Sequence, residues 1–132
     1  MSNILKISEA ASIALHAMII LAKKQNELVS VKDIANQLDV SANHLSKVLQ
    51  RLVKAELVAS IKGNKGGFRL AKNPEDVNFL EVYEAIDGKF KPSTCLLSKP
   101  SCNQTCIMGD LMGSINKQVE DFFINTKLTD FM

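Results

Sequence analysis

Hydrophobic residues recur at steps of three and four along the N-terminal part of the chain, a spacing that predicts amphipathic helices. A first helix is expected from the N-cap Ser8 to about Lys24, and a short second helix is expected after the N-cap Ser30. Ser41 is the expected N-cap of a third helix, whose inner face is Leu45, Val48, Leu49, Leu52 and Val53. A short helix, a tight turn and a longer helix form the outline of a helix-turn-helix.

Two short β-prone segments, 57–61 and 68–70, follow the third helix. The loop between them is rich in glycine and lysine, so the pair predicts a β-hairpin with a cationic tip. Such a loop can also bind nucleotide phosphates, but the Walker spacing is absent and no Ser or Thr follows Lys65. We therefore interpret the hairpin as a wing that follows a helix of recognition type.

The C-terminal part of the chain predicts two further helices. Asn78 is expected to cap a helix over 79–87 that Gly88 ends, whereas residues 89–105 show no periodicity. A long helix is expected from about Ile107 to Ile124, with an apolar stripe at Met108, Leu111, Ile115, Val119 and Phe122. This stripe needs a partner surface, and helix-turn-helix proteins usually bind DNA as two-fold dimers, so we expect a homodimer.

Composition places the chain among ordinary globular proteins, with 46% hydrophobic and 23% charged residues. The longest apolar run, 13–22, is too short to span a membrane, and no signal-peptide pattern precedes it. These features predict a cytoplasmic protein with no membrane partner.

Positive charge is concentrated in one quarter of the chain. Residues 41–73 contain seven basic residues against Glu56 alone, a net charge of +6, whereas the whole chain has +2. Such a patch is typical of an element that binds a polyanion, although a solvated helix face with a lysine-rich loop is the alternative.

Double-stranded DNA is the polyanion that a winged helix-turn-helix is expected to bind. Three side chains early in the third helix are expected to approach base edges: Asn43, His44 and Lys47. Three others on that helix are expected to contact phosphate: Ser41, Arg51 and Lys54. The remaining exposed candidates on it are Ser46 and Gln50. The wing residues expected at the flanking backbone or the minor groove are Lys62, Asn64, Lys65 and Arg69.

Three cysteines lie within twelve residues of the irregular segment: Cys95, Cys102 and Cys106. Three thiolates from one loop suit an iron–sulfur cluster or zinc, although both usually take four ligands. A redox-active thiol set and three inert thiols are the alternatives. The odd number argues against a closed disulfide framework, and the polar neighbours argue against three buried cysteines.

The wing sequence GNKGGFRL at 63–70, the sequence LEVYEAI at 80–86 and the three-cysteine segment together resemble the IscR/NsrR/CymR (Rrf-two) family of bacterial regulators. The resemblance extends from Ile7 to the tail at 127–130. It implies a homodimer with crossing C-terminal helices and an iron–sulfur cluster in each subunit, with 2Fe–2S preferred over 4Fe–4S. In this family the cluster state changes DNA affinity in response to iron–sulfur status, nitric oxide or redox stress, although some members have no cluster.

The fourth cluster ligand is where the chain departs from this family. IscR-type members use a histidine three residues after the last cysteine, where this chain has Gly109. NsrR-type members can use an aspartate in the first helix of the other subunit, where this chain has Ser12. The remaining candidates are Glu9, Ser12 and His16 across the dimer and Asp110 locally. An IscR-type glutamate in the recognition helix aligns with Ser46, so its base preference is not transferred.

The predicted fold is mainly α with a small β-hairpin: a winged helix-turn-helix with a long C-terminal dimerisation helix. We divide it into a DNA-binding domain at 1–88, a cysteine-bearing cluster loop at 89–106, and a dimerisation helix with its tail at 107–132. The predicted function is a DNA-binding transcription regulator, expected to be a repressor, that an iron–sulfur cluster gates.

Two alternatives to this function remain. The first is a cluster-free regulator that senses thiol oxidation. The second is a winged-helix protein–protein adaptor, which the positive segment disfavours. With two histidines and no acid–base pair or nucleophile motif, the sequence does not predict an enzyme.

Overall fold

The computed structural model describes residues 7–91, 107 and 110–132. Its helices and strands are, in order, α1 (Glu9–Lys23), α2 (Val31–Leu38), α3 (Ala42–Lys54), β1 (Val58–Ile61), β2 (Gly67–Leu70), η1 (Pro74–Asp76), α4 (Phe79–Asp87), α5 (Leu111–Asn125) and η2 (Leu128–Phe131). The two strands form an antiparallel sheet, and η1 and η2 are short 3-10 helices. A mainly helical chain with one small hairpin confirms the predicted fold class.

The helices begin at polar side chains that bond their first free N–H groups. Ser8, Ser30 and Ser41 each accept a hydrogen bond from the backbone N–H three residues on, at 3.0–3.1 Å. Asn78 accepts from the N–H of Glu81 at 2.9 Å, and Glu81 accepts from the N–H of Asn78 at 3.4 Å. Each cap satisfies a donor that has no partner within its helix, which is why these four starts were predictable from the sequence.

Helix α1 is the centre of the core. It packs against α2, α3, α4, β2 and η2, and its alanines allow close approach of these neighbours. The largest fully buried side chains come from all of these helices and from the chain between them: Met18, Leu21, Ile34, Leu45, Leu49, Leu52, Val77, Val82 and Leu128. The helix-turn-helix and the end of the C-terminal segment therefore share one core.

The hairpin is attached to the helices through a bridge that the sequence analysis missed. Val29, between α1 and α2, donates its N–H to the carbonyl of Phe68 at 2.9 Å and accepts from the N–H of Phe68 at 2.8 Å. Glycine is required beside this bridge, because a Cβ at Gly67 would lie 2.8 Å from the carbonyl oxygen of Val29. A Cβ at Gly66 would lie 2.1 Å from a backbone oxygen of β1.

Helix α5 differs from its prediction in both start and rotation. It begins at Leu111, not near Ile107, with Asp110 as its N-cap residue, although the Asp110 side chain forms no capping hydrogen bond. Its buried side chains are Met112, Asn116 and Phe123. Leu111 and Phe122 of the predicted stripe are instead 50% and 55% exposed.

The rotation of α5 follows from its contact with α4. The ring centroid of Phe123 lies 5.6 Å from that of Tyr83 and 6.3 Å from that of Phe79. With Phe123 turned inward, Leu111 and Phe122 of the predicted stripe are exposed, whereas Ile115 and Val119 are half-buried and Val119 packs against the core. Met108, the first residue of that stripe, lies outside the described residues.

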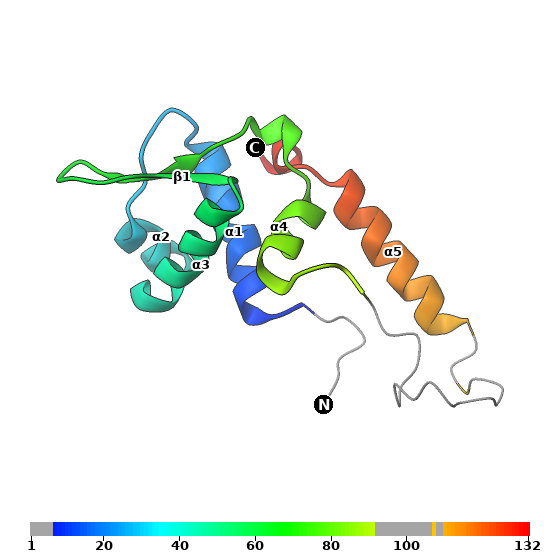
Figure 1. Cartoon of the computed structure of the whole chain (residues 1–132). Helices are drawn as coiled ribbons and strands as arrows, with labels where there is room; N and C mark the ends of the chain where they lie inside the picture. The colour runs from blue at the N-terminus through cyan, green and yellow to red at the C-terminus, as the bar shows by residue number, and fades with distance from the viewer. Residues whose placement is uncertain (1–6, 92–106, 108–109) are drawn as a thin grey trace.

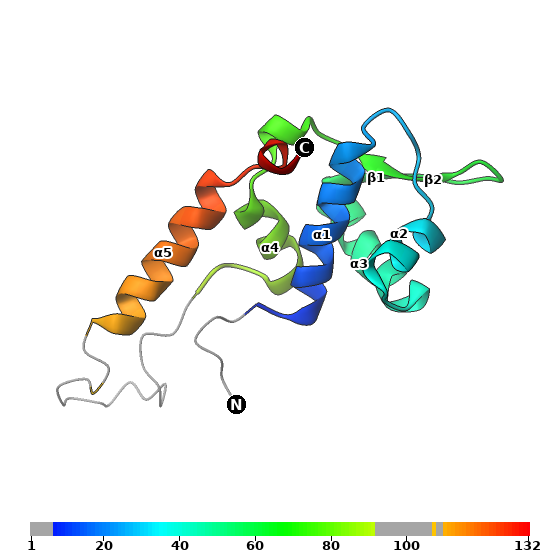
Figure 2. The same cartoon turned by 180° about the vertical axis from the view of Figure 1, so that it is seen from behind.

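The elements are arranged along the length of the molecule. In Figure 1, α2, α3 and the hairpin lie toward one end, α1 and α4 lie in the middle, and α5 lies at the other end. The view from behind in Figure 2 shows the same order. None of the helices in the described part of the chain is long and apolar enough to cross a membrane.

Candidate nucleic-acid interface

The outer face of α3 presents polar and basic side chains in one line. Asn43, Lys47, Gln50 and Lys54 follow one another at steps of four, three and four, so they lie along a single side of the helix. All four are exposed, while Leu45, Val48, Leu49 and Leu52 are buried on the opposite side and Val53 is half-buried. We name Asn43, Lys47, Gln50 and Lys54 the α3 line.

Three further predicted residues lie at the start of α3. The Oγ of Ser41 accepts the N–H of His44 at 3.0 Å, so this hydroxyl caps the helix and retains its own hydrogen for donation. Ser41 is exposed, whereas His44 and Ser46 are half-buried beside the α3 line. A phosphate contact from Ser41 is therefore compatible with its role as a cap.

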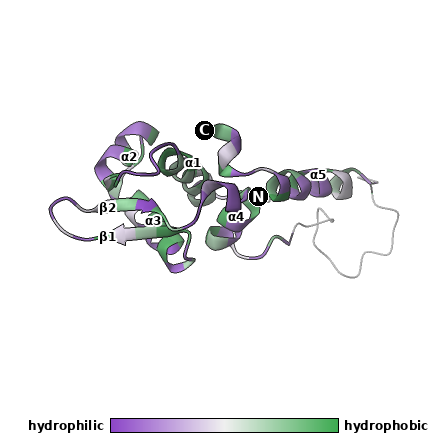
Figure 3. Cartoon of the chain, turned by 90° about the horizontal axis from the view of Figure 1, so that it is seen from above, coloured by the Kyte–Doolittle hydropathy of each residue, from purple (hydrophilic) through white to green (hydrophobic). Residues whose placement is uncertain are grey.

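The wing projects beyond the helices, as Figures 1 and 3 show. Its predicted DNA contacts are all exposed: Lys62, Asn64, Lys65 and Arg69. Gly63 has φ +120°, a conformation that favours glycine, so the tight cationic tip depends on this residue. Among the residues that the structure describes, no carboxylate forms an ion pair with these cations. The one ion pair there joins Lys72 to Glu81 at 3.5 Å.

Arg51 has a protein partner that the sequence analysis did not find. Its Nη2 donates to the carbonyl oxygen of Ile86, in the last turn of α4. Carbonyls in a last turn have no N–H partner within their helix, and a cation there also interacts favourably with the helix dipole. Arg51 follows Gln50 directly and is therefore turned by about 100° from the α3 line. This offset places Arg51 toward the side of α3 that meets α4, and it is the one feature of the sequence that could have indicated a partner there.

The last turn of α4 is connected to several parts of the molecule. The carboxylate of Asp87 accepts the Oγ–H of Ser8 at 2.5 Å and the N–H of Ser8 at 3.1 Å. The carboxylate of Glu84 accepts the N–H of Phe90 at 2.9 Å. Burial raises the pKa of the Tyr83 phenol above its ordinary value, and the nearby charges of Asp87 and Glu84 raise it further. Tyr83 therefore stays neutral at physiological pH.

The structure describes the candidates for the fourth cluster ligand but not the three cysteines. Cys95, Cys102 and Cys106 lie outside the described residues, as does Gly109. In the described ranges, no three His, Cys, Asp or Glu side chains are grouped to hold a metal ion. The candidates for a fourth ligand are all described: Glu9, Ser12, His16 and Asp110.

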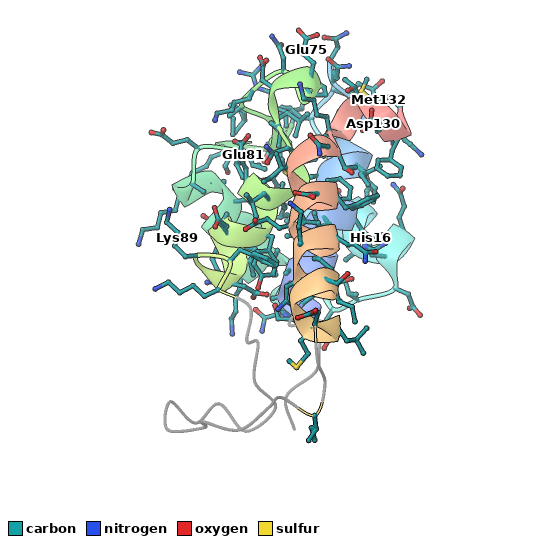
Figure 4. All side chains as sticks on the ribbon, turned by 90° about the vertical axis from the view of Figure 1, so that its right-hand side faces the viewer. His16, Glu75, Glu81, Lys89, Asp130 and Met132 are labelled. Atoms are coloured by element: carbon teal, nitrogen blue, oxygen red, sulfur yellow. The ribbon has the colours of Figure 1, made fainter. Side chains whose placement is uncertain are left out.

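These four candidates differ in how their donor atoms are engaged. His16 Nδ1 lies 2.7 Å from the carbonyl oxygen of Ser12, and a proton on Nδ1 leaves Nε2 as the basic nitrogen. Both residues line a pocket of about 220 Å³ with Ile13, Leu38 and Val40. Asp110 and Glu9 are exposed, and the Asp110 carboxylate forms no capping hydrogen bond. Figure 4 shows His16 and Lys89 on opposite sides of α5.

A capped short helix, a longer helix with an exposed polar line and a projecting cationic hairpin define the winged helix-turn-helix class of DNA-binding proteins. The chain belongs to the Rrf2 family: residues 7–132 match the family model described as an iron-dependent transcriptional regulator.

Known members and structures agree with this assignment. The chain is 36% identical to the HTH-type transcriptional regulator NsrR of Bacillus licheniformis, over 83% of this chain and 75% of that protein. The structure of CymR, the global cysteine regulator of B. subtilis, is similar with a TM-score of 0.80 and 29% identity, covering 96% and 95% of the two chains. T. potens IscR is similar with a TM-score of 0.73 and 26% identity, covering 96% and 85%. These relatives are regulators and not enzymes.

Proposed function

We propose that this transcription regulator binds an operator in double-stranded DNA as a homodimer and acts as a repressor. Helix α3 enters the major groove with Asn43, Lys47 and Gln50 of the α3 line toward the bases, and the wing contacts the flanking backbone or the minor groove. The exposed α3 line beside the cationic hairpin is the observation that carries this proposal. Ser41 and Lys54 contact phosphate, and His44 and Ser46 flank the base-reading residues.

Base reading by α3 is tested with a duplex that the wild-type protein selects from a random-sequence library. Asn43→Ala is expected to cost about 1–3 kcal/mol and to relax the preference at one base pair, because an amide can bond adenine on two sites. Lys54→Gln is expected to weaken binding to all duplex sequences by the same factor, because it removes a phosphate contact. Asn125→Ala, at the end of α5, is the matched control. Unchanged base preference in the Asn43 variant would contradict the assignment.

The homodimer is supported by exposed apolar residues on α5. Leu111 and Phe122, on one side of α5, are 50% and 55% exposed, and Ile107, just before the helix, is 91% exposed. Large exposed apolar patches commonly mark association surfaces. A second copy of α5 would cover this side and would give the two-fold symmetry that an operator with two half-sites requires.

We also propose that an iron–sulfur cluster, preferably 2Fe–2S, gates DNA affinity. Cys95, Cys102 and Cys106 would hold it, because three thiols within twelve residues suit iron and the family model is described as iron-dependent. Thiolate-bound iron supplies a group that oxygen, nitric oxide or iron shortage can remove. Asp110 of the same chain and His16 or Glu9 of the other subunit are the candidates for a fourth ligand, since each has a donor atom available.

Thiol oxidation without a metal is the second candidate for regulation. The chain is 28% identical, with a TM-score of 0.75, to a structure of Staphylococcus aureus CymR in an oxidized form. The same three cysteines could then form a reversible disulfide or sulfenic acid.

Anaerobic purification separates the two modes. A cluster predicts visible absorbance and bound iron, which each single Cys→Ser variant loses, together with a change in duplex affinity when iron is removed. Asp110→Asn and His16→Gln then report the fourth ligand, with Asp121→Asn as the control on the exposed side of α5. Colourless, iron-free protein after anaerobic reconstitution would contradict cluster gating. A change in affinity on thiol oxidation of that protein would support the second mode.

A further inference from the structure

We propose that Arg51 is a positioning residue and not a phosphate contact. It holds recognition helix α3 to the last turn of α4, where the chain continues toward Cys95, and so transmits the state of that segment to the DNA-reading surface. The proposal rests on the proposed function and names the residue through which regulation reaches α3.

The first observation is the direction of the Arg51 side chain. Its guanidinium donates to the carbonyl oxygen of Ile86 and lies against the negative end of the α4 dipole. The neighbouring cations of α3, Lys47 and Lys54, have no protein partner among the described residues and belong to the α3 line. Lys47 and Lys54 therefore have no competing protein acceptor in the described part of the chain, whereas the guanidinium of Arg51, although the residue is exposed, is held toward α4.

The second observation is that the same turn of α4 holds the chain that leads away from it. Glu84 accepts the N–H of Phe90 at 2.9 Å. The ring of Phe90 packs against those of Tyr83 and Phe123, at centroid distances of 5.7 and 6.4 Å. Cys95 follows Phe90 by only five residues, so these contacts of Phe90 lie close in sequence to the first cysteine.

The third observation is that Glu84 and Ile86 lie within one helical turn. A movement that pulls Phe90 away from Glu84 disturbs the turn whose carbonyl binds Arg51. Helix α3 is then less firmly fixed relative to α4. Both the cysteine segment and DNA would bias this same hydrogen bond, and an element that two sites share in this way gives them a coupling free energy.

The salt dependence of duplex binding distinguishes the two roles of Arg51. In cluster-free protein, Lys54→Gln is expected to lower the slope of log K against log salt by about one unit per subunit, because one phosphate is no longer neutralised. Arg51→Gln is expected to change this slope by less than half as much while still changing the affinity. An equal decrease of slope in the two variants would make Arg51 a phosphate-binding residue and overturn the proposal.

A double-mutant cycle tests the transmission itself. Glu84→Met removes the acceptor that holds Phe90, and its effect on duplex affinity is expected to be non-additive with that of Arg51→Gln, by a factor of about five or more. Glu84→Met and Lys54→Gln, the matched control pair, are expected to be additive. Arg51→Lys retains a cationic donor, so its coupling to Glu84→Met is expected to stay as in the wild-type protein. Circular dichroism confirms that each variant is folded.

Additive effects of Arg51→Gln and Glu84→Met would overturn the proposal. Because both measurements use cluster-free protein, a failure of cluster gating does not change their outcome. Wild-type protein that binds no duplex would instead overturn the proposed function, and the positioning role with it.

Discussion

Single residues determine how the wing is attached to the helices. Val29 forms two backbone hydrogen bonds with Phe68, and Phe68 is buried to 6% exposure. Gly67 is adjacent to this bridge and has no room for a side chain. The glycine pair in the cationic loop therefore does more than form the turn, because it lets the hairpin approach the backbone between α1 and α2.

Gly67→Ala is expected to lower the free energy of unfolding by about 1–3 kcal/mol, since its Cβ would lie 2.8 Å from the Val29 carbonyl oxygen. Gly113→Ala on α5 is the opposite control. A Cβ added at Gly113 would have no atom outside its own turn of α5 within 4 Å, and alanine stabilises a helix by about 0.5–1 kcal/mol relative to glycine. Urea denaturation measures both. A Gly67 variant as stable as wild type would show that the bridge does not hold the wing.

Predictions for single residues were correct where the interaction joins residues close together in the sequence. Ser8, Ser30, Ser41 and Asn78 cap the helices they were expected to cap, because an N-cap depends on residues three positions apart. The partner of Arg51 was not predictable in this way. It lies 35 residues away, and only the packing of α3 on α4 brings the two together.

At the scale of the element, Ser41 has two roles at the start of α3: it caps the helix, and it is the proposed phosphate contact. Ser41→Ala is expected to cost about 1 kcal/mol of stability, because the N–H of His44 loses its acceptor. Ser41→Asp is expected to keep the cap and the stability but to weaken DNA binding, since a carboxylate repels phosphate. Urea denaturation and fluorescence anisotropy measure the two effects separately. Wild-type DNA affinity in Ser41→Asp would remove Ser41 from the interface.

The starts of α1 to α4 and the bounds of the two hairpin strands were predictable to within a residue, but the rotation of α5 was not. The periodicity of α5 showed an apolar stripe without showing which surface covers each part of it. Phe123 packs against the rings of Tyr83 and Phe90, whereas Phe122 is exposed, and these contacts join segments far apart in the sequence. The cysteine ligands lie outside the described residues, so their assignment stays a prediction.

At the scale of the whole molecule, the exposed side of α5 predicts the oligomeric state. Leu111→Glu combined with Ile115→Glu is expected to yield a folded monomer, because burying two carboxylates in an apolar interface costs several kcal/mol. In the single chain Leu111 is 50% exposed and Ile115 is only partly buried, so the fold of each subunit should tolerate both substitutions. Lys117→Glu, at an exposed position of α5 that lies about 120° or more around the helix from Leu111 and Ile115, is the control. Sedimentation of the double variant as a dimer would place the interface elsewhere.

The arrangement in Figure 1 also has a consequence for regulation. The DNA-reading elements and α5 lie at opposite ends, and α1 and α4 connect them. A change that reaches Phe90 would therefore pass through α4, in the middle of the molecule, before it reaches α3. The last turn of α4, bonded to α1 through Ser8 and to α3 through Arg51, is suited to carry it.

The central claim is that α3 and the wing grip the DNA backbone together, and the salt dependence of binding tests it most directly. Wild type and the triple variant Lys47→Gln, Lys54→Gln and Lys65→Gln are compared on the selected duplex by fluorescence anisotropy between about 50 and 200 mM salt. A control variant neutralises Lys89, Lys117 and Lys127, which lie outside the α3 line and the wing. The account predicts a slope shallower by about 0.9 for each phosphate that the triple variant no longer neutralises, and a wild-type slope in the control. Equal slopes and affinities for wild type and the triple variant would contradict it.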